Sequence, residues 1–333
     1  MSYIVSHNLT KRFGKAHPVW ALGGLSLSVE PGEVFGLLGP NGSGKTTFVK
    51  SCLNIIFPTS GDLWVLGFRP GHPMAQRQVG YLPENPNFYG HLNGLSFLNY
   101  HAELAGIPYR YRKSRVHEVL ELVKLEPSAV KRRLKTYSKG MTQRIGLAQA
   151  LLGWPRVLFL DEPQTGLDPI GRRLVKDIMV HAAQKGSAVL FSSHVLGDVE
   201  DVADRIAIID HGRLRKIASL DDLTLHTNKV DVRLRPRFTP PGVVFNDEEE
   251  YARLKPVLEK IKVANEQYYS GMLTCTLQDE NEIPNLVYAL AQNDFKIYEI
   301  NQEKMSLEEV FFQEFGEVIP PQVRQQNSNT MAS

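Results

Sequence analysis

The apolar positions of the chain change their spacing along its length. Residues 1–39 alternate as β-strands do and end in the continuous apolar run 34–39, VFGLLG. A glycine-rich segment, a predicted helix through residues 48–56 and a short predicted strand over 78–83 follow. From about residue 90 to 152, apolar residues recur at helical spacing instead. The clearest sets are Val116, Val119, Leu120 and Val123, and Met141, Ile145, Ala148 and Leu152.

From residue 156 onward, apolar strands alternate with helices. Strands are predicted over 156–160, 187–193, 205–210 and 214–218, and helices over 171–184 and 196–203. Continuous apolar strands separated by helices indicate a mostly parallel sheet that is covered on both faces. The pattern therefore predicts an α/β fold for residues 1–220, with a helical subdomain inserted at about residues 85–150.

The last third of the chain has a different character. The segments PRFTPPG (236–242) and NDEEEY (246–251) are predicted to be linker and solvated surface. Strands are then predicted over 272–277 and 295–300, and helices over 281–292 and 307–315. We expect a small accessory α+β domain over 221–316 and a flexible polar tail over 317–333.

Composition and charge narrow the possible partners. The 333 residues carry a formal net charge of +2, which is too small to predict a nucleic-acid surface. The two cysteines, Cys52 and Cys275, lie far apart without metal-ligand spacing, which fits a reducing cytosol. The sequence has no leader-like start and no apolar stretch of the ~18 residues that a membrane span needs. We expect a cytoplasmic protein that reaches a membrane only through a partner.

A phosphate-binding motif follows the apolar run that ends at residue 39. GPNGSGKT (39–46) fits G-x-x-x-x-G-K-[ST] between a predicted strand and a predicted helix. Its glycines let backbone N–H groups surround phosphate oxygens, and the helix start adds partial positive charge. Lys45 can reach the β- and γ-phosphates, and the Thr46 hydroxyl can bind Mg²⁺. The nucleotide-binding candidates are Gly39, Pro40, Asn41, Gly42, Ser43, Gly44, Lys45, Thr46 and Thr47.

Two adjacent carboxylates end another apolar strand. In VLFLDEP (157–163), Asp161 suits a second contact to Mg²⁺, and Glu162 lies where an attacking water needs a base. Together with the phosphate loop, these residues predict nucleoside triphosphate hydrolysis.

Two other segments resemble GTPase motifs. They are NKVD (228–231), like the guanine-reading tetrapeptide, and DPIG (168–171), like a Mg²⁺ loop. DPIG does not directly follow an apolar strand, and NKVD lies at the expected domain junction. We therefore do not favour a GTPase.

In chain order, the motifs resemble those of the ATP-binding subunit of an ABC transporter, over residues 1 to about 220. The phosphate loop corresponds to Walker A and VLFLDEP to Walker B. Five further matches are Phe13, the aromatic that stacks on adenine; GYLPE (80–84), with Glu84 at the position of the Q-loop glutamine; YSKGM (137–141), like the LSGGQ signature; TGLD (165–168), the D-loop with Asp168; and SSH (192–194), with the switch histidine His194.

The resemblance implies an ATPase that uses ATP and Mg²⁺. It implies catalytic roles for Glu162, His194 and Glu84, and Mg²⁺ contacts from Thr46, Glu84 and Asp161. It also implies that Ser138 and Gly140 close over ATP held by a second copy, in a head-to-tail dimer. The sequence departs from the family pattern at Glu84 and, within the signature, at Tyr137, Lys139 and Met141.

The resemblance further implies a separate polytopic permease, which places the protein on the cytoplasmic face of a membrane. The family docks its permease on the helical insert, here 85–107, and GYLPE, YSKGM and MSLEEVF (305–311) resemble its exporter branch. The basic residues near the insert, Arg110, Arg112, Lys113, Arg115, Lys131, Arg132, Arg133 and Lys135, are either a solvated face or lie near anionic headgroups. The alternative function is a non-transport ABC ATPase acting in translation or on DNA. The single ATPase half and the absence of sustained heptads argue against it.

Overall fold

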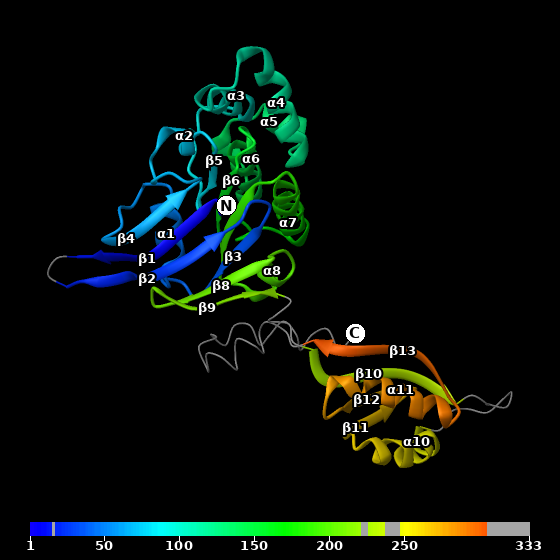
Figure 1. The fold of residues 1–333 in the computed structure, drawn as a ribbon. Coiled ribbons are helices and arrows are strands. Elements are labelled where there is room, and N and C mark those ends of the chain that lie inside the picture. Colours follow the sequence, from blue (N-terminus) through cyan, green and yellow to red (C-terminus); the bar gives the residue numbers. More distant parts are fainter. Residues whose placement is uncertain (15–16, 221–225, 237–246, 305–333) are drawn as a thin grey trace. The chain divides into compact units, whose positions relative to one another are not determined.

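The computed structural model describes residues 1–14, 17–220, 226–236 and 247–304. The chain divides into two compact units, with the division after Leu220, and each unit is described here by itself (Figure 1). The predicted helix 307–315, the segment MSLEEVF and the predicted tail 317–333 lie outside the described residues.

A six-stranded sheet forms the centre of the first unit. Its order is β5-β6-β7-β3-β8-β9, and all neighbours are parallel except β9, which pairs antiparallel with β8. Every residue of β3, β6 and β7 is buried, as continuous apolar strands require. The predicted mostly parallel sheet is thereby confirmed. The strands are β3 (Val34–Leu38), β5 (Val79–Leu82), β6 (Val157–Asp161), β7 (Ala188–Ser193), β8 (Arg205–Asp210) and β9 (Arg213–Ser219).

The register of these strands brings the chemically active segments to one edge. Leu38 pairs with Ser193, and Asp161 pairs with Ser192. Because the strands are parallel, the glycine-rich loop after β3, the carboxylates that end β6 and the histidine after β7 leave the sheet at the same edge. The helices that follow two of these strands are α7 (Pro169–Gln184) and α8 (Leu196–Glu200).

A second, antiparallel sheet packs against the first through a shared core. Its order is β2-β1-β4, and it consists of β1 (Ile4–Phe13), β2 (Val19–Val29) and β4 (Ser60–Val65). Ile4, Leu22 and Leu63 of this sheet lie in one buried cluster with Phe35 of β3 and Phe48 of α1 (Lys45–Cys52). Strand β4 and the short helix α2 (Pro73–Gln76) were not predicted from the sequence.

The helical insert occupies one end of the first unit (Figure 1). The buried side chains of α4 and α6 include Val116, Val119, Ile145 and Ala148, which confirms the predicted apolar faces. Helix α6 packs closely against β5: a Cβ atom added at Gly146 would lie only 2.7 Å from the Leu82 side chain. The insert consists of α3 (Gly94–Leu104), α4 (Tyr109–Leu122), α5 (Pro127–Val130), a 3₁₀ turn (Leu134–Thr136) and α6 (Lys139–Leu151).

In its described residues, the second unit is a four-stranded antiparallel sheet of order β11-β12-β10-β13 with two α-helices. It has its own core, which includes Val230, Leu254, Leu273 and Leu286. NKVD lies within β10, where Val230 and Asp231 pair with neighbouring strands on both sides. The elements are β10 (His226–Pro236), α10 (Asp247–Ile261), β11 (Ala264–Tyr269), β12 (Met272–Thr276), a 3₁₀ turn (Glu280–Glu282), α11 (Ile283–Gln292) and β13 (Phe295–Lys304).

The prediction that NDEEEY is linker and solvated surface was wrong about its secondary structure, because residues 247–251 begin a helix. Four acids, Asp247 to Glu250, form the first turn of α10, where negative charge is favourable beside the positive end of the helix. Glu250 is also buried and accepts a hydrogen bond from the Tyr268 hydroxyl. Residues 237–242 of the predicted linker lie outside the described part of the chain.

Candidate nucleotide-binding site

The glycine-rich loop runs from the end of β3 at Leu38 to the start of α1 at Lys45. Gly42 and Gly44 adopt left-handed φ angles of 82° and 110°. A Cβ atom on Gly44 would lie 2.3 Å from the Ala21 carbonyl oxygen, so this position requires glycine. The first N–H groups of α1 have no acceptor within the helix, as at any helix start, and are available to an anionic ligand.

Lys45 is buried at the base of this loop, with 6% of its surface exposed. Its Nζ donates to the carbonyl oxygens of Gly39, at 2.6 Å, and Pro40, at 3.2 Å. It lies 3.7 Å from Glu162 Oε1. Burial lowers the pKa of Lys45, and the nearby carboxylates, Glu162 first, oppose that shift. The ammonium group is thus held beside both the loop and the end of β6.

Two hydroxyl groups converge on Asp161. Thr46 Oγ1, in the first turn of α1, donates to Asp161 Oδ1 at 3.0 Å, and Ser192 Oγ of β7 donates to the same oxygen at 2.6 Å. Ser192 Oγ also accepts from the Glu162 backbone N–H at 2.9 Å. Sequence reasoning assigned no role to Ser192. The available signal was a polar residue at the end of an otherwise apolar strand, next to His194.

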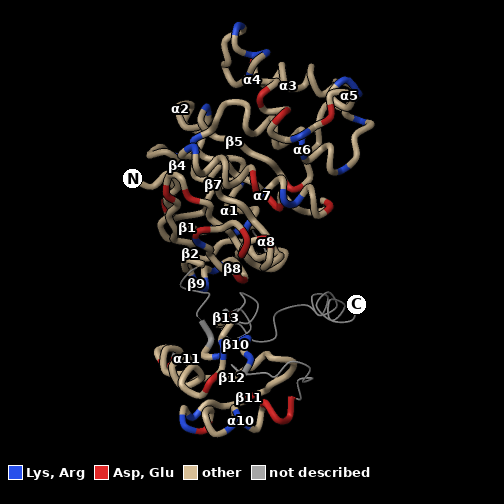
Figure 2. Tube along the Cα trace, turned by 90° about the vertical axis from the view of Figure 1, so that its right-hand side faces the viewer, with Lys and Arg blue, Asp and Glu red and all other residues tan. Residues whose placement is uncertain are grey.

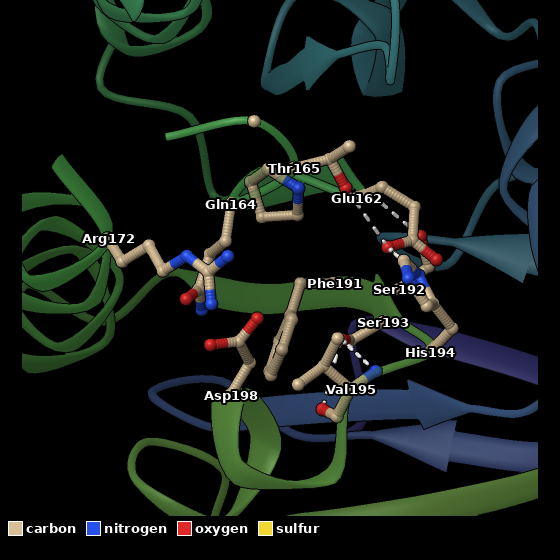
Figure 3. A pocket seen from close by; sticks show the side chains of 12 residues that line it. Glu162, Gln164, Thr165, Arg172, Phe191, Ser192, Ser193, His194, Val195 and Asp198 are labelled. Carbon is tan, nitrogen blue, oxygen red and sulfur yellow. Dashed lines mark hydrogen bonds and ion pairs between the residues drawn. The ribbon is translucent and has the colours of Figure 1, made fainter. Parts of the chain in front are cut away.

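Glu162 and His194 form a hydrogen-bonded pair beyond the ends of β6 and β7 (Figure 3). His194 Nδ1 lies 2.8 Å from Glu162 Oε2, and Glu162 Oε1 is buried without a hydrogen-bond partner among the residues that the structure describes. The backbone of Glu162 has a left-handed φ of 49°. For a non-glycine residue this conformation costs of order 1–3 kcal/mol and is typical of functional positions. The carboxylate therefore has one oxygen fixed by His194 and one oxygen near Lys45.

A small polar cavity of about 160 Å³ lies behind this pair (Figure 3). Gln164 lines the cavity, is 4% exposed, and has no hydrogen-bond partner for either amide atom within the described structure. Arg172 and Asp198 line the same space. Burial raises the pKa of Asp198, and the charges of Arg172 and Lys176 partly offset that effect. Gln164 and Asp198 are further residues of this site that sequence reasoning missed.

The three predicted Mg²⁺ contacts are only partly brought together. Thr46 and Asp161 form a hydroxyl–carboxylate pair, whereas Glu84 is exposed and no hydrogen bond joins it to either residue among the described residues. Glu84 leaves the sheet at the same edge, because Leu82 pairs with Leu160. Burial lowers the pKa of Lys45, and the charge of Glu84 is the smallest of the effects that oppose this shift. No cluster of three His, Cys, Asp or Glu residues suitable for a metal occurs in the described ranges. The pair Thr46–Asp161 nevertheless fits Mg²⁺, which usually takes few protein oxygens and completes its shell with phosphate and water.

Phe13 ends β1 and pairs with Val19 at the loop end of the β1–β2 hairpin. Its ring is 43% exposed and lies 4.9 Å from Lys11 Nζ. Two residues after Val19, the Ala21 carbonyl contacts the loop at Gly44, so the hairpin runs beside the loop. Trp20 on β2 is also exposed and lies under Arg12, which makes it a second aromatic candidate that sequence reasoning missed.

The signature-like segment lies at the start of α6. Ser138 is its N-cap, and its Oγ accepts from the Met141 N–H at 3.3 Å. The Lys139 side chain covers Gly166, where an added Cβ would lie 2.5 Å from Nζ. Asp168 caps α7 by accepting from the Gly171 N–H at 2.8 Å. In the described part of the chain, no hydrogen bond joins residues 138–140 to the loop 39–46.

The structure thus places the predicted residues in two groups. Lys45, Thr46, Asp161, Glu162 and His194 share one cluster with the rest of the loop. The signature and the D-loop form a second group on the same chain, in which Lys139 covers Gly166 and Gly140 lies beside Leu167, next to Asp168. No helix within the described residues is long and apolar enough to cross a membrane.

Comparisons with known proteins agree with the motifs. The sequence profile of the family described as ABC transporter matches residues 22–165. An uncharacterised ABC transporter ATP-binding protein of Nostoc sp. is 38% identical over 294 residues, which cover 88% of this chain and 82% of that protein. The bacitracin transport ATP-binding protein BcrA of Bacillus licheniformis is 36% identical over 236 residues, which cover 69% of this chain and 74% of BcrA.

Solved structures show the same fold. The ATP-binding subunit of an ABC transporter superposes with a TM-score of 0.61 at 29% identity, covering 67% of this chain and 92% of that one. The ATP-binding cassette MJ0796, in a dimeric post-hydrolysis state bound to ADP and Pi, has a TM-score of 0.59 at 22% identity, covering 65% and 98%. The motifs, the site and these similarities lead to one conclusion: the chain belongs to the ATP-binding proteins of ABC transporters and is an ATP-hydrolysing subunit of such a transporter.

Proposed function

We propose that two copies of this subunit bind ATP and Mg²⁺ between them and that hydrolysis drives a separate membrane permease. The observation that carries the hydrolytic part is the placement of Glu162. One carboxylate oxygen accepts a hydrogen bond from His194 Nδ1 at 2.8 Å, and the other lies 3.7 Å from Lys45 and has no hydrogen-bond partner among the described residues. A base in that position, beside a phosphate-binding lysine, suits the activation of water for attack on the γ-phosphate.

The residues of this chain then divide the work between binding and proton transfer. The loop N–H groups and Lys45 hold the phosphates and compensate their charge, which positions the γ-phosphate in line with a water beside Glu162. Glu162 takes the proton of that water. His194 fixes the carboxylate and offers its ring to the γ-phosphate. Thr46 and Asp161 would hold Mg²⁺, which, when bound, neutralises charge on the β- and γ-phosphate oxygens. We propose Glu84 as a third contact to Mg²⁺, made either through a bridging water or after movement of the loop that carries it.

The dimer follows from the division of the site residues into two groups. Ser138 and Lys139 are exposed at a helix start, where N–H groups attract anions, and lack hydrogen bonds to the loop of their own chain. A second copy in head-to-tail arrangement would bring Ser138 and Gly140 to the γ-phosphate held by the first copy. The dimeric cassette MJ0796, which has the same fold, supports this arrangement.

The permease would dock on the helical insert, which places the subunit on the cytoplasmic face of the membrane. Tyr89 and Tyr100 are 57% and 45% exposed and meet edge to face at 6.3 Å, with His91 beside Tyr89. Exposed aromatic side chains are typical of protein interfaces. The resemblance of GYLPE and YSKGM to the exporter branch favours export, and the transport of bacitracin by the BcrA system supports a membrane role.

Replacement of Glu162 by Gln tests the proposal. The variant should bind ATP, hydrolyse it roughly 10²–10⁴ times more slowly, and accumulate as a dimer when ATP is present. Light scattering coupled to gel filtration measures the dimer, and phosphate release measures hydrolysis. Lys45→Ala is the control, because it should lose ATP binding and stay monomeric. Near-normal turnover by Glu162→Gln would contradict the role of Glu162, and a monomer with tightly bound ATP would contradict the dimer.

A further inference from the structure

The turn between α3 and α4, together with the start of α4, forms an exposed tip at the free end of the helical insert (Figure 1). We call residues 104–113 the α3–α4 tip. It presents apolar and aromatic side chains to solvent: Leu104 is 64% exposed, Tyr109 is 86% exposed and Tyr111 is 52% exposed. Leu104 ends α3, and Tyr109 and Tyr111 lie in the first turn of α4, so the tip adjoins Tyr100, which lies one turn before Leu104 on α3.

The same segment carries unbalanced positive charge (Figure 2). No acid occurs between Glu103 and Glu118, whereas Arg110, Arg112, Lys113 and Arg115 all lie in that interval. Arg112 pairs with Glu103 at 3.0 Å, and Arg115 pairs with Glu118 at 2.7 Å. Within the described residues, Arg110 and Lys113 have no ion pair. The tip therefore keeps two unpaired cations next to its tyrosines.

These cations do not serve the stability of α4. The helix begins after Pro108 without a side-chain cap and has no acid in its first turn. Cations in the first turn oppose the helix macrodipole, and acids would be favourable there. A departure from a local rule without structural gain is typical of a functional surface. The unsatisfied N–H groups at this helix start add to the positive potential and suit phosphate oxygens.

We propose that the α3–α4 tip binds directly to a membrane surface that contains anionic phospholipids. Tyrosine favours the boundary between headgroups and acyl chains, and Lys and Arg are attracted to anionic headgroups. The cations and tyrosines of the tip lie next to one another: Arg110 lies 4.7 Å from the Tyr111 ring centroid, and Arg112 lies 5.9 Å from that of Tyr109. This contact goes beyond the proposed permease, since it needs no protein partner.

Vesicle flotation of the purified full chain tests the proposal. Phosphatidylcholine vesicles that contain phosphatidylserine should carry the protein upward, and phosphatidylcholine vesicles alone should not. Added salt should weaken the binding, because surface charges are screened. The double variant Arg110→Gln/Lys113→Gln should bind about 25-fold more weakly, at about fivefold for each lost charge. Tyr109→Ser should also weaken binding, and more visibly at high salt, where the apolar contribution dominates.

A matched variant separates this surface from net charge. Lys131→Gln/Arg133→Gln removes the same two charges from exposed positions outside the tip and should bind as the wild type does. Unchanged ATPase activity of all variants verifies folding, since none of these residues belongs to the nucleotide site. No binding of the wild type to anionic vesicles, or equal weakening by both double variants, would overturn the proposal. Binding that appears only with a permease in the vesicles would assign the tip to a protein partner instead.

Discussion

At the residue scale, a single hydroxyl group connects the two acids that end β6 to the neighbouring strand. Ser192 Oγ donates to Asp161 Oδ1 and accepts the Glu162 N–H, while Thr46 reaches the same Asp161 oxygen from the phosphate loop. The left-handed backbone of Glu162 is held in part by this N–H contact. The proposed base and the proposed metal contact therefore depend on a residue that would touch neither ATP nor Mg²⁺.

Ser192→Ala should weaken both stability and catalysis. The change leaves a buried carboxylate oxygen with one donor fewer and a buried N–H without its acceptor, which costs about 1–3 kcal/mol for each such group. Urea denaturation measures the stability, and phosphate release measures kcat. Ser193→Ala is the matched control, because in the described part of the chain its hydroxyl bonds only to the backbone of Val195. Equal effects of the two changes would contradict the special position of Ser192.

Two exposed aromatic residues compete for the role of adenine partner. Phe13→Ala should weaken ATP binding by about 1–3 kcal/mol, the range measured for base stacking on aromatic side chains. Trp20→Ala should leave ATP affinity unchanged. Titration with a fluorescent ATP analogue distinguishes the two residues. Weaker binding only in Trp20→Ala would transfer the proposed stacking role from Phe13 to Trp20.

At the scale of elements, charges join the helix that follows the D-loop to the helix that follows the switch histidine. Lys176 of α7 pairs with Asp201 just after α8 and lies 3.9 Å from Asp198 of α8. One turn earlier in α7, Arg172 lines the small cavity that Asp198 also lines (Figure 3). Helix α7 begins at its cap Asp168, and α8 begins two residues after His194. The two proposed nucleotide-sensing segments are thus anchored to one another within each chain.

Asp198 should give this contact a dependence on pH. Burial raises the pKa of Asp198, so the folded protein keeps its proton at pH values where the unfolded chain has lost it. The unfolded chain then binds fewer protons, and the free energy of unfolding falls as pH rises from the unfolded pKa through the folded pKa. Asp198→Asn should remove this fall, which urea denaturation across acidic pH measures. Asp201→Asn, at a largely exposed carboxylate, should keep it. A curve for Asp198→Asn that runs parallel to the wild type would contradict the assignment.

Elements set by local patterns were predictable, and elements set by distant contacts were not. Strands β3, β6 and β7 follow from continuous apolar runs, and the phosphate loop follows from its glycines and its place between strand and helix. Strand β4 was missed because it is short and only half buried. Helix α10 was mistaken for surface because its acids suggest solvent, although acids also favour a helix start. The partners of Ser192 and the burial of Gln164 could not be foreseen, since they depend on how β6 and β7 lie side by side.

At the scale of the whole molecule, each nucleotide site is proposed to be divided between two copies of the chain. Each chain has a phosphate loop with Lys45 and a signature-like segment at Ser138, and no hydrogen bond joins the two in the described residues. The second unit has its own core around Val230 and Leu254, and all the nucleotide-site residues described above lie in the first unit. In the proposed dimer, the first unit of each copy would therefore place its signature segment over the nucleotide held by the other copy.

Mixing two inactive variants tests this division most directly. Lys45→Ala removes a phosphate contact and Ser138→Arg blocks a signature segment, so neither variant alone should have ATPase activity. A mixed dimer contains one site built from the intact loop of the Ser138→Arg chain and the intact signature of the Lys45→Ala chain. Part of the wild-type phosphate release should return on mixing, in proportion to the mixed dimers counted by native mass spectrometry. Abundant mixed dimers without any activity would contradict the shared site.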